Sequence, residues 1–143
     1  MSVSYAPRYL TTAASLASLR AVTEFVREGA REANLPEERA GELDLLVEEV
    51  IANVCAHAFP PGSPGDVTVT YSVLAPGELS VEVADQGVEF NPLQAAAPDV
   101  TLSLEQRPIG GLGILLVKSF AKSLTYRRED GWNRLTFALS AGS

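Results

Sequence analysis

The segment from Leu43 to Ala58, LDLLVEEVIANVCAHA, constrains the fold more than any other part of the chain. Its apolar residues recur at the i, i+3, i+4, i+7 spacing of one helical face, at Leu43, Leu46, Val47, Val50, Ile51 and Val54. At about 100° per residue, Glu49, Asn53 and His57 form a second line along the edge of this face, and Glu48 points toward solvent. The pattern predicts a helix that carries a carboxylate, an amide and an imidazole at the border of a core.

Each of these three polar residues also has an ordinary structural explanation. A glutamate on a helix is usually solvated, and a histidine is more often a satisfied core or cap residue than a ligand. An asparagine in mid-helix is a poor helix former because its amide competes for backbone groups, although one tertiary hydrogen bond would account for it. The helix alone therefore leaves a pocket and a solvated helix edge as alternatives.

The composition favours one acidic globular domain. The 143 residues carry a net charge of -7, which argues against nucleic acid or an anionic membrane as the main partner. The single cysteine, Cys55, excludes an internal disulfide and is expected to be a small buried residue in the central helix. The N-terminus lacks a signal-peptide pattern, so we expect one cytoplasmic domain over residues 1–143.

The rest of the chain alternates between helical and strand periods. The expected elements are a short strand over 4–12, a helix over 15–33, a helix from Pro36 through the 43–58 segment, strands over 67–73 and 79–83, a helix after Gly113, and strands over 123–128 and 134–139. Because strands and helices do not alternate strictly, we predict an α+β fold. This is a two-layer sandwich with three helices on one face of a mixed, mainly antiparallel sheet.

Two further places can carry chemistry. Asp85-Gln86-Gly87 ends a predicted strand, and a glycine cluster at Gly110, Gly111 and Gly113 opens a predicted helix. Free backbone N–H groups at a helix N-terminus bind phosphate, and glycine allows a close approach. Both patterns also occur in ordinary turns. The segment between them, at about 91–109, is long and without periodicity, which is typical of a functional lid.

In this order, the pieces resemble the GHKL ATPase superfamily with its Bergerat nucleotide-binding fold, and more narrowly the bacterial anti-sigma factor serine kinases. Glu49-x-x-x-Asn53 resembles the N-box of that superfamily. Asp85-Gln-Gly87-Val-Glu-Phe-Asn-Pro resembles the box that contacts adenine, and Gly110-Gly-Leu-Gly113 the glycine box after the ATP lid. The tail from Leu124 to Phe137 is typical of the narrower group, so the resemblance covers nearly the whole chain.

The resemblance implies a role for each box. Glu49 would be the catalytic base toward the hydroxyl that attacks the γ-phosphate. Asn53 would bind Mg²⁺ through its amide oxygen, and Asp85 would accept a hydrogen bond from the adenine amino group, with Gly87 beside the base. The phosphates of ATP would contact a glycine box made of Gly110, Gly111, Leu112 and Gly113. His57 would border the phosphate site.

Three positions depart from the family pattern. Glu89 stands where the adenine box usually has a second glycine, and Arg134-Leu135 replaces a threonine pair of the last strand. In some relatives an arginine directly precedes the glycine box, but here Pro108 and Ile109 follow Arg107. The replacement of the threonine pair leaves the far side of the adenine pocket without a residue-level prediction, whereas Glu89 is expected to have little effect on binding.

The resemblance further implies a cytoplasmic protein-serine kinase and anti-sigma factor. Such a protein uses Mg-ATP to phosphorylate a serine of a small STAS-domain anti-sigma antagonist, binds a sigma factor in alternation, and is expected to be a homodimer. One alternative keeps the fold without catalysis, as a nucleotide-binding module that switches partners. Another is the catalytic part of a histidine kinase, which the absence of a phosphoacceptor-histidine helix disfavours.

Overall fold

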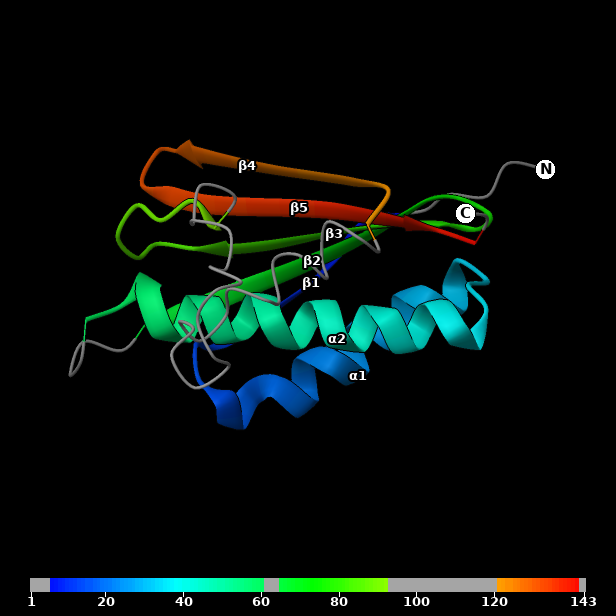
Figure 1. The fold of residues 1–143 in the computed structure, drawn as a ribbon, viewed down its shortest axis with the longest axis horizontal. Helices are drawn as coiled ribbons and strands as arrows, with labels where there is room; N and C mark the ends of the chain where they lie inside the picture. The colour runs from blue at the N-terminus through cyan, green and yellow to red at the C-terminus, as the bar shows by residue number, and fades with distance from the viewer. Residues whose placement is uncertain (1–5, 61–64, 93–120, 142–143) are drawn as a thin grey trace, which may run out of the picture.

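The computed structural model describes residues 6–60, 65–92 and 121–141. Their elements follow in the order β1 (Arg8–Ala13), the 3₁₀ helix η1 (Leu16–Ser18), α1 (Leu19–Glu32), α2 (Glu37–Asn53), the π-helical turn η2 (Val54–Ala58), β2 (Asp66–Ala75), β3 (Glu78–Asp85), β4 (Ser123–Glu129) and β5 (Trp132–Ser140). Figure 1 shows the sheet as one layer and the helices as the other. The predicted two-layer α+β fold is confirmed.

The five strands form one sheet in the order β1-β2-β3-β5-β4. Every strand pair among the described residues is antiparallel, so the sheet is less mixed than predicted. Asp85 of β3 lies opposite Asn133 of β5, and Asn133 lies opposite Arg128 of β4. Directly opposed residues in an antiparallel sheet share a face. These three residues therefore form one polar row on the face that the helices cover.

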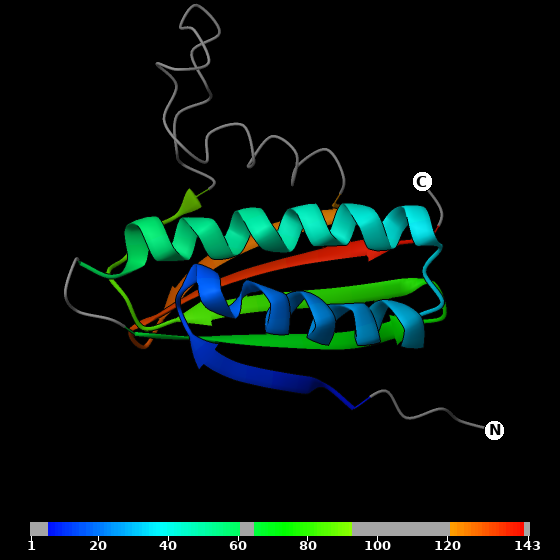
Figure 2. The same cartoon turned by 90° about the horizontal axis from the view of Figure 1, so that it is seen from below.

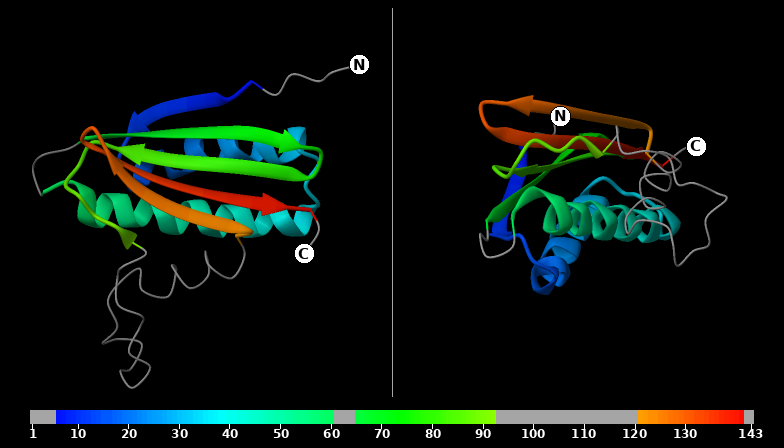
Figure 3. Two further views of the ribbon diagram at one scale, coloured as in Figure 1. Left: turned by 90° about the horizontal axis from the view of Figure 1, so that it is seen from above. Right: turned by 60° about the vertical axis from the view of Figure 1, so that its left-hand side comes forward.

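Helices α1 and α2 lie side by side on the same face of the sheet, as Figures 2 and 3 show from different directions. All six apolar residues predicted for the 43–58 face are buried. They pack with residues of α1 and the inner face of the sheet, including Val22, Val26, Tyr71, Leu79, Phe137 and Leu139. Burial of this apolar surface is the main contribution to the stability of the fold.

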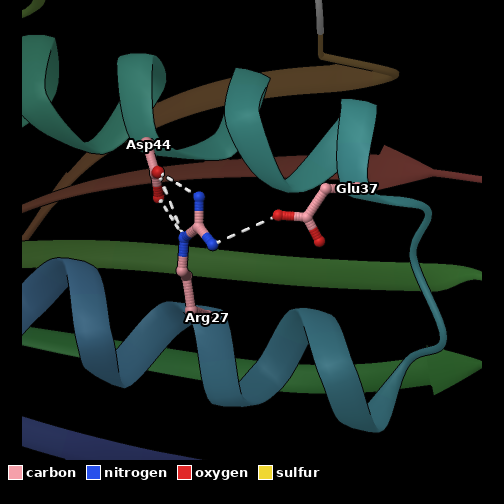
Figure 4. A network of polar contacts seen from close by, with 3 residues as sticks. All are labelled: Arg27, Glu37 and Asp44. Atoms are coloured by element: carbon pink, nitrogen blue, oxygen red, sulfur yellow. Dashed lines mark hydrogen bonds and ion pairs between the residues drawn. The ribbon is translucent and has the colours of Figure 1, made fainter.

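The two helices are also joined by an ion-pair network on their outer side (Figure 4). Arg27 of α1 donates through Nη2 to Oδ2 of Asp44 at 2.6 Å and through Nη1 to Glu37 at 3.5 Å. Asp44 raises the pKa of Arg27 by hydrogen bonding and charge. Arg27 and Asp44 are both partly exposed, so their ion pair contributes little to the stability of the fold.

The third predicted helix begins after Gly113 and lies outside the described residues, which contain two α-helices. The strand predicted over 4–12 is observed at Arg8–Ala13, next to β2 at the edge of the sheet. The central helix does not continue as an α-helix to Ala58, because its last turn, Val54–Ala58, is π-helical. A π-helix has a wider turn than an α-helix, so residues past Asn53 depart from the 100° spacing used in the prediction.

Candidate functional site: a polar pocket between α2 and the sheet

A small pocket lies between the C-terminal half of α2 and the inner face of β3, β5 and β4. Its polar lining comes from Asn53, Asp85 and Asn133, and its apolar lining includes Val50, Val83 and Leu135. The pocket is partly open to solvent, and its water-accessible volume is about 30 Å³, room for one or two water molecules. Typical ligand pockets measure about 300–1,000 Å³, so the space bounded by the described residues is smaller than a typical ligand pocket.

Asp85 ends β3 inside this pocket and is 3% exposed. Its Oδ1 accepts hydrogen bonds from the backbone N–H of Gly87 at 2.8 Å and from Nδ2 of Asn133 at 2.9 Å. A buried carboxylate is costly unless donors surround it, and these two donors meet that requirement at Oδ1. Oδ2 can then accept a hydrogen bond from a ligand in the pocket.

Asn133 connects the polar groups on this side of the pocket by hydrogen bonds, and it was not predicted as a site residue. Besides Asp85, its amide donates to the carbonyl of Val88 at 2.8 Å. Its Oδ1 accepts from the hydroxyl of Tyr126 at 2.6 Å and from the N–H of Phe90 at 3.2 Å. These contacts use both donors and both acceptor positions of the amide, and the residue is 5% exposed.

One sequence signal points to Asn133. In β5 the inward positions alternate as Asn133, Leu135, Phe137 and Leu139, so a single amide stands in an otherwise apolar series. A buried amide at a core-facing position needs hydrogen-bond partners. Those partners lie on β3, β4 and the turn after β3, and the strand register that brings them together is not visible in the sequence.

The turn after Asp85 is held tightly against the end of the central helix. The N–H of Val88 donates to the carbonyl of Ala58 at 2.8 Å, and Arg128 donates to the carbonyl of Gly87 at 2.8 Å. A Cβ atom on Gly87 would lie 2.1 Å from the carbonyl oxygen of Ala58. Glycine is therefore required here by packing against η2, whatever else Gly87 does beside a base.

Glu49 and Asn53 lie one turn apart on α2, as predicted. Glu49 is half-buried, and its Oε1 is buried without a hydrogen-bond partner among the described residues. Burial raises the pKa of Glu49, and the charge of the neighbouring Glu48 adds to the shift. Asn53 is 8% exposed, lines the pocket and makes no hydrogen bond within the described part of the chain. Asn53 is thus available to a ligand in the pocket, whereas Glu49 lies one turn before it and outside the pocket lining.

His57 departs from the predicted line because it lies in the π-helical turn. Its side chain is exposed and stacks on the ring of Phe90, with 4.5 Å between ring centroids and 21° between planes. Phe90 lines the pocket and precedes the segment predicted as the lid. Short π-helical segments frequently occur at functional sites, and this one places Ala58 and His57 against the turn that follows Asp85.

Several predicted residues lie outside the described part of the chain. These are Arg107, the glycine box Gly110, Gly111, Leu112 and Gly113, and nearly all of the predicted lid. Their roles stay predictions. Among the described helices, none is both long enough and apolar enough to cross a membrane.

With this geometry in place, sequence comparison identifies the class of protein. The sequence profile of the histidine kinase-like ATPase domain family matches residues 12–139. The chain therefore belongs to this family, which confirms the superfamily expected from the ordered boxes.

Particular relatives fall within the narrower group. The chain is similar to the serine/threonine-protein kinase BtrW of Bordetella bronchiseptica, with 38% identity over 94 residues that cover 66% of each protein. It is also similar to the serine-protein kinase RsbW of Listeria monocytogenes, with 32% identity over 63% of this chain and 59% of that protein. The matches therefore span slightly less than two thirds of the length of these relatives.

A solved structure shares the fold. The crystal structure of the RsbU and RsbW domains of a Mycobacterium tuberculosis protein matches with a TM-score of 0.64 and 15% identity. The match covers 94% of this chain and 32% of that one. At this identity the likeness concerns the fold alone, and it agrees with the antiparallel sheet and two covering helices described above.

Proposed function

We propose that this protein is a cytoplasmic ATP-dependent protein-serine kinase and anti-sigma factor. It would transfer the γ-phosphate of ATP to a serine of a STAS-domain antagonist. It would alternatively bind a sigma factor and hold it inactive. The observation that carries the proposal is that one pocket contains a buried acceptor, Asp85, and the amide of Asn53. One helical turn before Asn53, Oε1 of Glu49 is buried without a hydrogen-bond partner among the described residues. Family membership and the names of the kinase relatives support the same reaction class.

Asp85 would recognise the base of the nucleotide. Its Oδ1 is occupied by two donors, and its Oδ2 accepts the hydrogen bond of an exocyclic amino group. A carboxylate acceptor at that position favours adenine, whose 6-amino group donates, over guanine, whose 6-oxo group does not. Val50, Val83 and Leu135 supply the apolar surfaces that a purine ring packs against.

The residues of α2 fit a magnesium ion and a reacting hydroxyl. Magnesium prefers oxygen ligands, keeps several waters and usually takes one or two protein ligands together with substrate phosphates. The amide oxygen of Asn53, which has no partner among the described residues, fits such a ligand. When bound, the ion neutralises charge that develops on the phosphates.

Glu49 would act as the general base. Its carboxylate accepts the proton of the serine hydroxyl while the serine oxygen bonds to the γ-phosphorus, and the bond from that phosphorus to the bridging oxygen breaks to release ADP. A general base works best when its pKa is near the working pH, and burial moves the pKa of Glu49 upward in that direction. The presence of Glu49 argues against a binding module without catalysis, because such a module would tolerate the loss of this residue.

The partners are proposed from the resemblance to anti-sigma factor kinases. The acidic surface disfavours direct contact with nucleic acid, so action on transcription would pass through a sigma factor. We further propose a homodimer.

The test is calorimetric titration of the protein with ATP, first in magnesium and then in EDTA. Magnesium-dependent binding is expected, followed by transfer of γ-phosphate to a serine of a STAS-domain protein. Tight binding without transfer to any such partner would favour the non-catalytic switching module. Absence of binding in both buffers would contradict the proposal.

A further inference from the structure

The base side of the pocket contains a chain of hydrogen bonds that crosses three strands. It starts at the hydroxyl of Tyr126 on β4, passes through the amide of Asn133 on β5 and ends at Oδ1 of Asp85 on β3. The two steps measure 2.6 and 2.9 Å. Asn133 is 5% exposed and Asp85 is 3% exposed, so water competes little for these contacts.

This chain has a defined direction. The N–H of Phe90 and the hydroxyl of Tyr126 both donate to Oδ1 of Asn133, so the amide oxygen faces these two donors and the NH₂ group faces Asp85. The NH₂ group also donates to the carbonyl of Val88, which holds the turn after β3 in place. Burial raises the pKa of Tyr126, and the charge of Glu89 adds to this, so its hydroxyl keeps its proton.

A carboxylate held in this way differs chemically from a free one. A carboxylate that rotates can meet either the 6-amino group of adenine or the N1–H of a 6-oxopurine, because both are donors on the same edge of the base. With Oδ1 of Asp85 bound to the N–H groups of Gly87 and Asn133, rotation would break two buried hydrogen bonds. A site with fixed acceptors rejects a base whose donor is displaced.

We propose that Asn133 is a positioning residue that selects 6-aminopurine over 6-oxopurine nucleotides by fixing the carboxylate of Asp85. This inference rests on the proposed function, because it takes Asp85 as the residue that reads the base. Tyr126 acts one step further out by orienting the amide of Asn133. Selection of the base then depends on strands β4 and β5 as well as on the box that contains Asp85.

The experiment measures dissociation constants for Mg-ATP and Mg-ITP by calorimetry. Inosine carries the 6-oxo group and N1–H without the 2-amino group of guanine, so it isolates the contact in question. The variants are Asn133→Ala, Tyr126→Phe and the control Thr136→Ala. Thr136 lies on the same strand, but its register partners, Glu82 and Thr125, are on the outer face of the sheet.

The wild type is expected to bind ATP at least roughly tenfold more tightly than ITP, the effect of one mismatched buried polar contact. Asn133→Ala should weaken ATP binding and strengthen ITP binding, so that the two dissociation constants lie within roughly threefold of each other. Tyr126→Phe keeps the ring and should reduce the ratio by roughly threefold. Thr136→Ala should keep the wild-type ratio.

Two results would overturn the role of Asn133 while leaving the proposed function intact. One is that Asn133→Ala and Tyr126→Phe both keep the wild-type ratio of the ATP and ITP dissociation constants. The other is an equal loss of ATP and ITP affinity, which a purely structural role predicts. If circular dichroism shows that Asn133→Ala is unfolded, the ratio of Tyr126→Phe decides the question. Equal binding of ATP and ITP by the wild type would instead contradict base reading by Asp85, and this inference with it.

Discussion

The two walls of the pocket differ in how their polar groups are satisfied. On the sheet side, Asp85 and Asn133 are almost fully buried and make hydrogen bonds to the turn after β3 and to Tyr126. On the helix side, Asn53 lines the pocket and makes no hydrogen bond to a described residue. Glu49 lies one turn before Asn53, outside the lining, and its Oε1 has no partner within the described part of the chain. A completed hydrogen-bond network on the sheet thus lies close to unpaired polar groups on the helix.

Under the proposed function, this difference would separate recognition of the base from the chemistry of phosphate transfer. Satisfied buried groups stabilise the native state and hold one geometry, which suits a wall that reads a base. Unsatisfied buried groups cost stability and persist where a ligand or a reaction uses them. Variants on the sheet side should therefore change binding and stability together. Variants on the helix side should change activity with little loss of stability, or even a gain.

The largest effect is expected at the helix wall, for Glu49→Gln. The amide keeps the size of the side chain but cannot accept the serine proton, so phosphotransfer should fall about 10²–10⁴-fold. ATP affinity should stay unchanged, because the change affects the reacting hydroxyl and not the base. Rates of ³²P transfer to a STAS partner measure this. Transfer at the wild-type rate would remove Glu49 from the role of base.

The next effect concerns the sheet wall, where Asp85→Ala should lose about 1–3 kcal/mol of ATP binding. It should also lower the free energy of unfolding by a similar amount, because the N–H groups of Gly87 and Asn133 lose their acceptor. Calorimetry and urea unfolding measure the two quantities. Lost stability with unchanged ATP affinity would show that Asp85 has a structural role alone.

Gly87→Ala tests how closely the turn packs against η2. The new methyl group would lie 2.1 Å from the carbonyl oxygen of Ala58, so the variant should lose about 1–3 kcal/mol of stability. Gly41→Ala is the matched control on α2, since a Cβ there meets nothing within 4 Å, and it should gain about 0.5–1 kcal/mol. Chemical unfolding compares the two. Equal stability of both variants would contradict the close approach at Gly87.

Asn53→Ala should differ from Asp85→Ala in its effect on stability. The affinity for ATP in magnesium should fall to the value that the wild type shows in EDTA, because the amide oxygen would be a metal ligand. Stability should stay within about 0.5 kcal/mol, since Asn53 makes no hydrogen bond to a described residue and alanine is the better helix former. A stability loss as large as that of Asp85→Ala would abolish the contrast between the walls.

The smallest effect is a pH dependence of stability at Glu49. Its pKa in the folded protein lies above the ordinary value of 4.5, so the folded state holds the proton more tightly than the unfolded state. The cost of the buried charge is therefore absent below about pH 4.5, grows as pH rises through the folded pKa and is complete above it. Glu49→Gln should match the wild type at pH 4 and be more stable at pH 8 by about 1 kcal/mol or less, because Glu49 is partly exposed. Thermal unfolding at both pH values measures the difference, and a constant gap would contradict the shift.

Much of this architecture was predictable from the chain. The apolar spacing from Leu43 to Val54 predicted the buried face of α2, and the period-two segments predicted β2, β3, β4 and β5. Glu49 and Asn53 were placed correctly on one side of α2, because α-helical geometry relates residues four apart. The π-helical turn that carries His57 was not predicted, because nothing in VCAHA distinguishes it from an α-helical turn.

Local patterns in the sequence thus determined which residues form helices and strands, which faces are apolar and which family the boxes belong to. The tertiary structure decided what surrounds Asp85. Its partner Asn133 is 48 residues away in the chain and reaches it through the antiparallel register of β3 and β5. Tyr126 and Ala58 come from two further elements. Short-range periodicity fixes one element at a time, whereas the satisfaction of a buried carboxylate depends on which distant strands and turns pack against it.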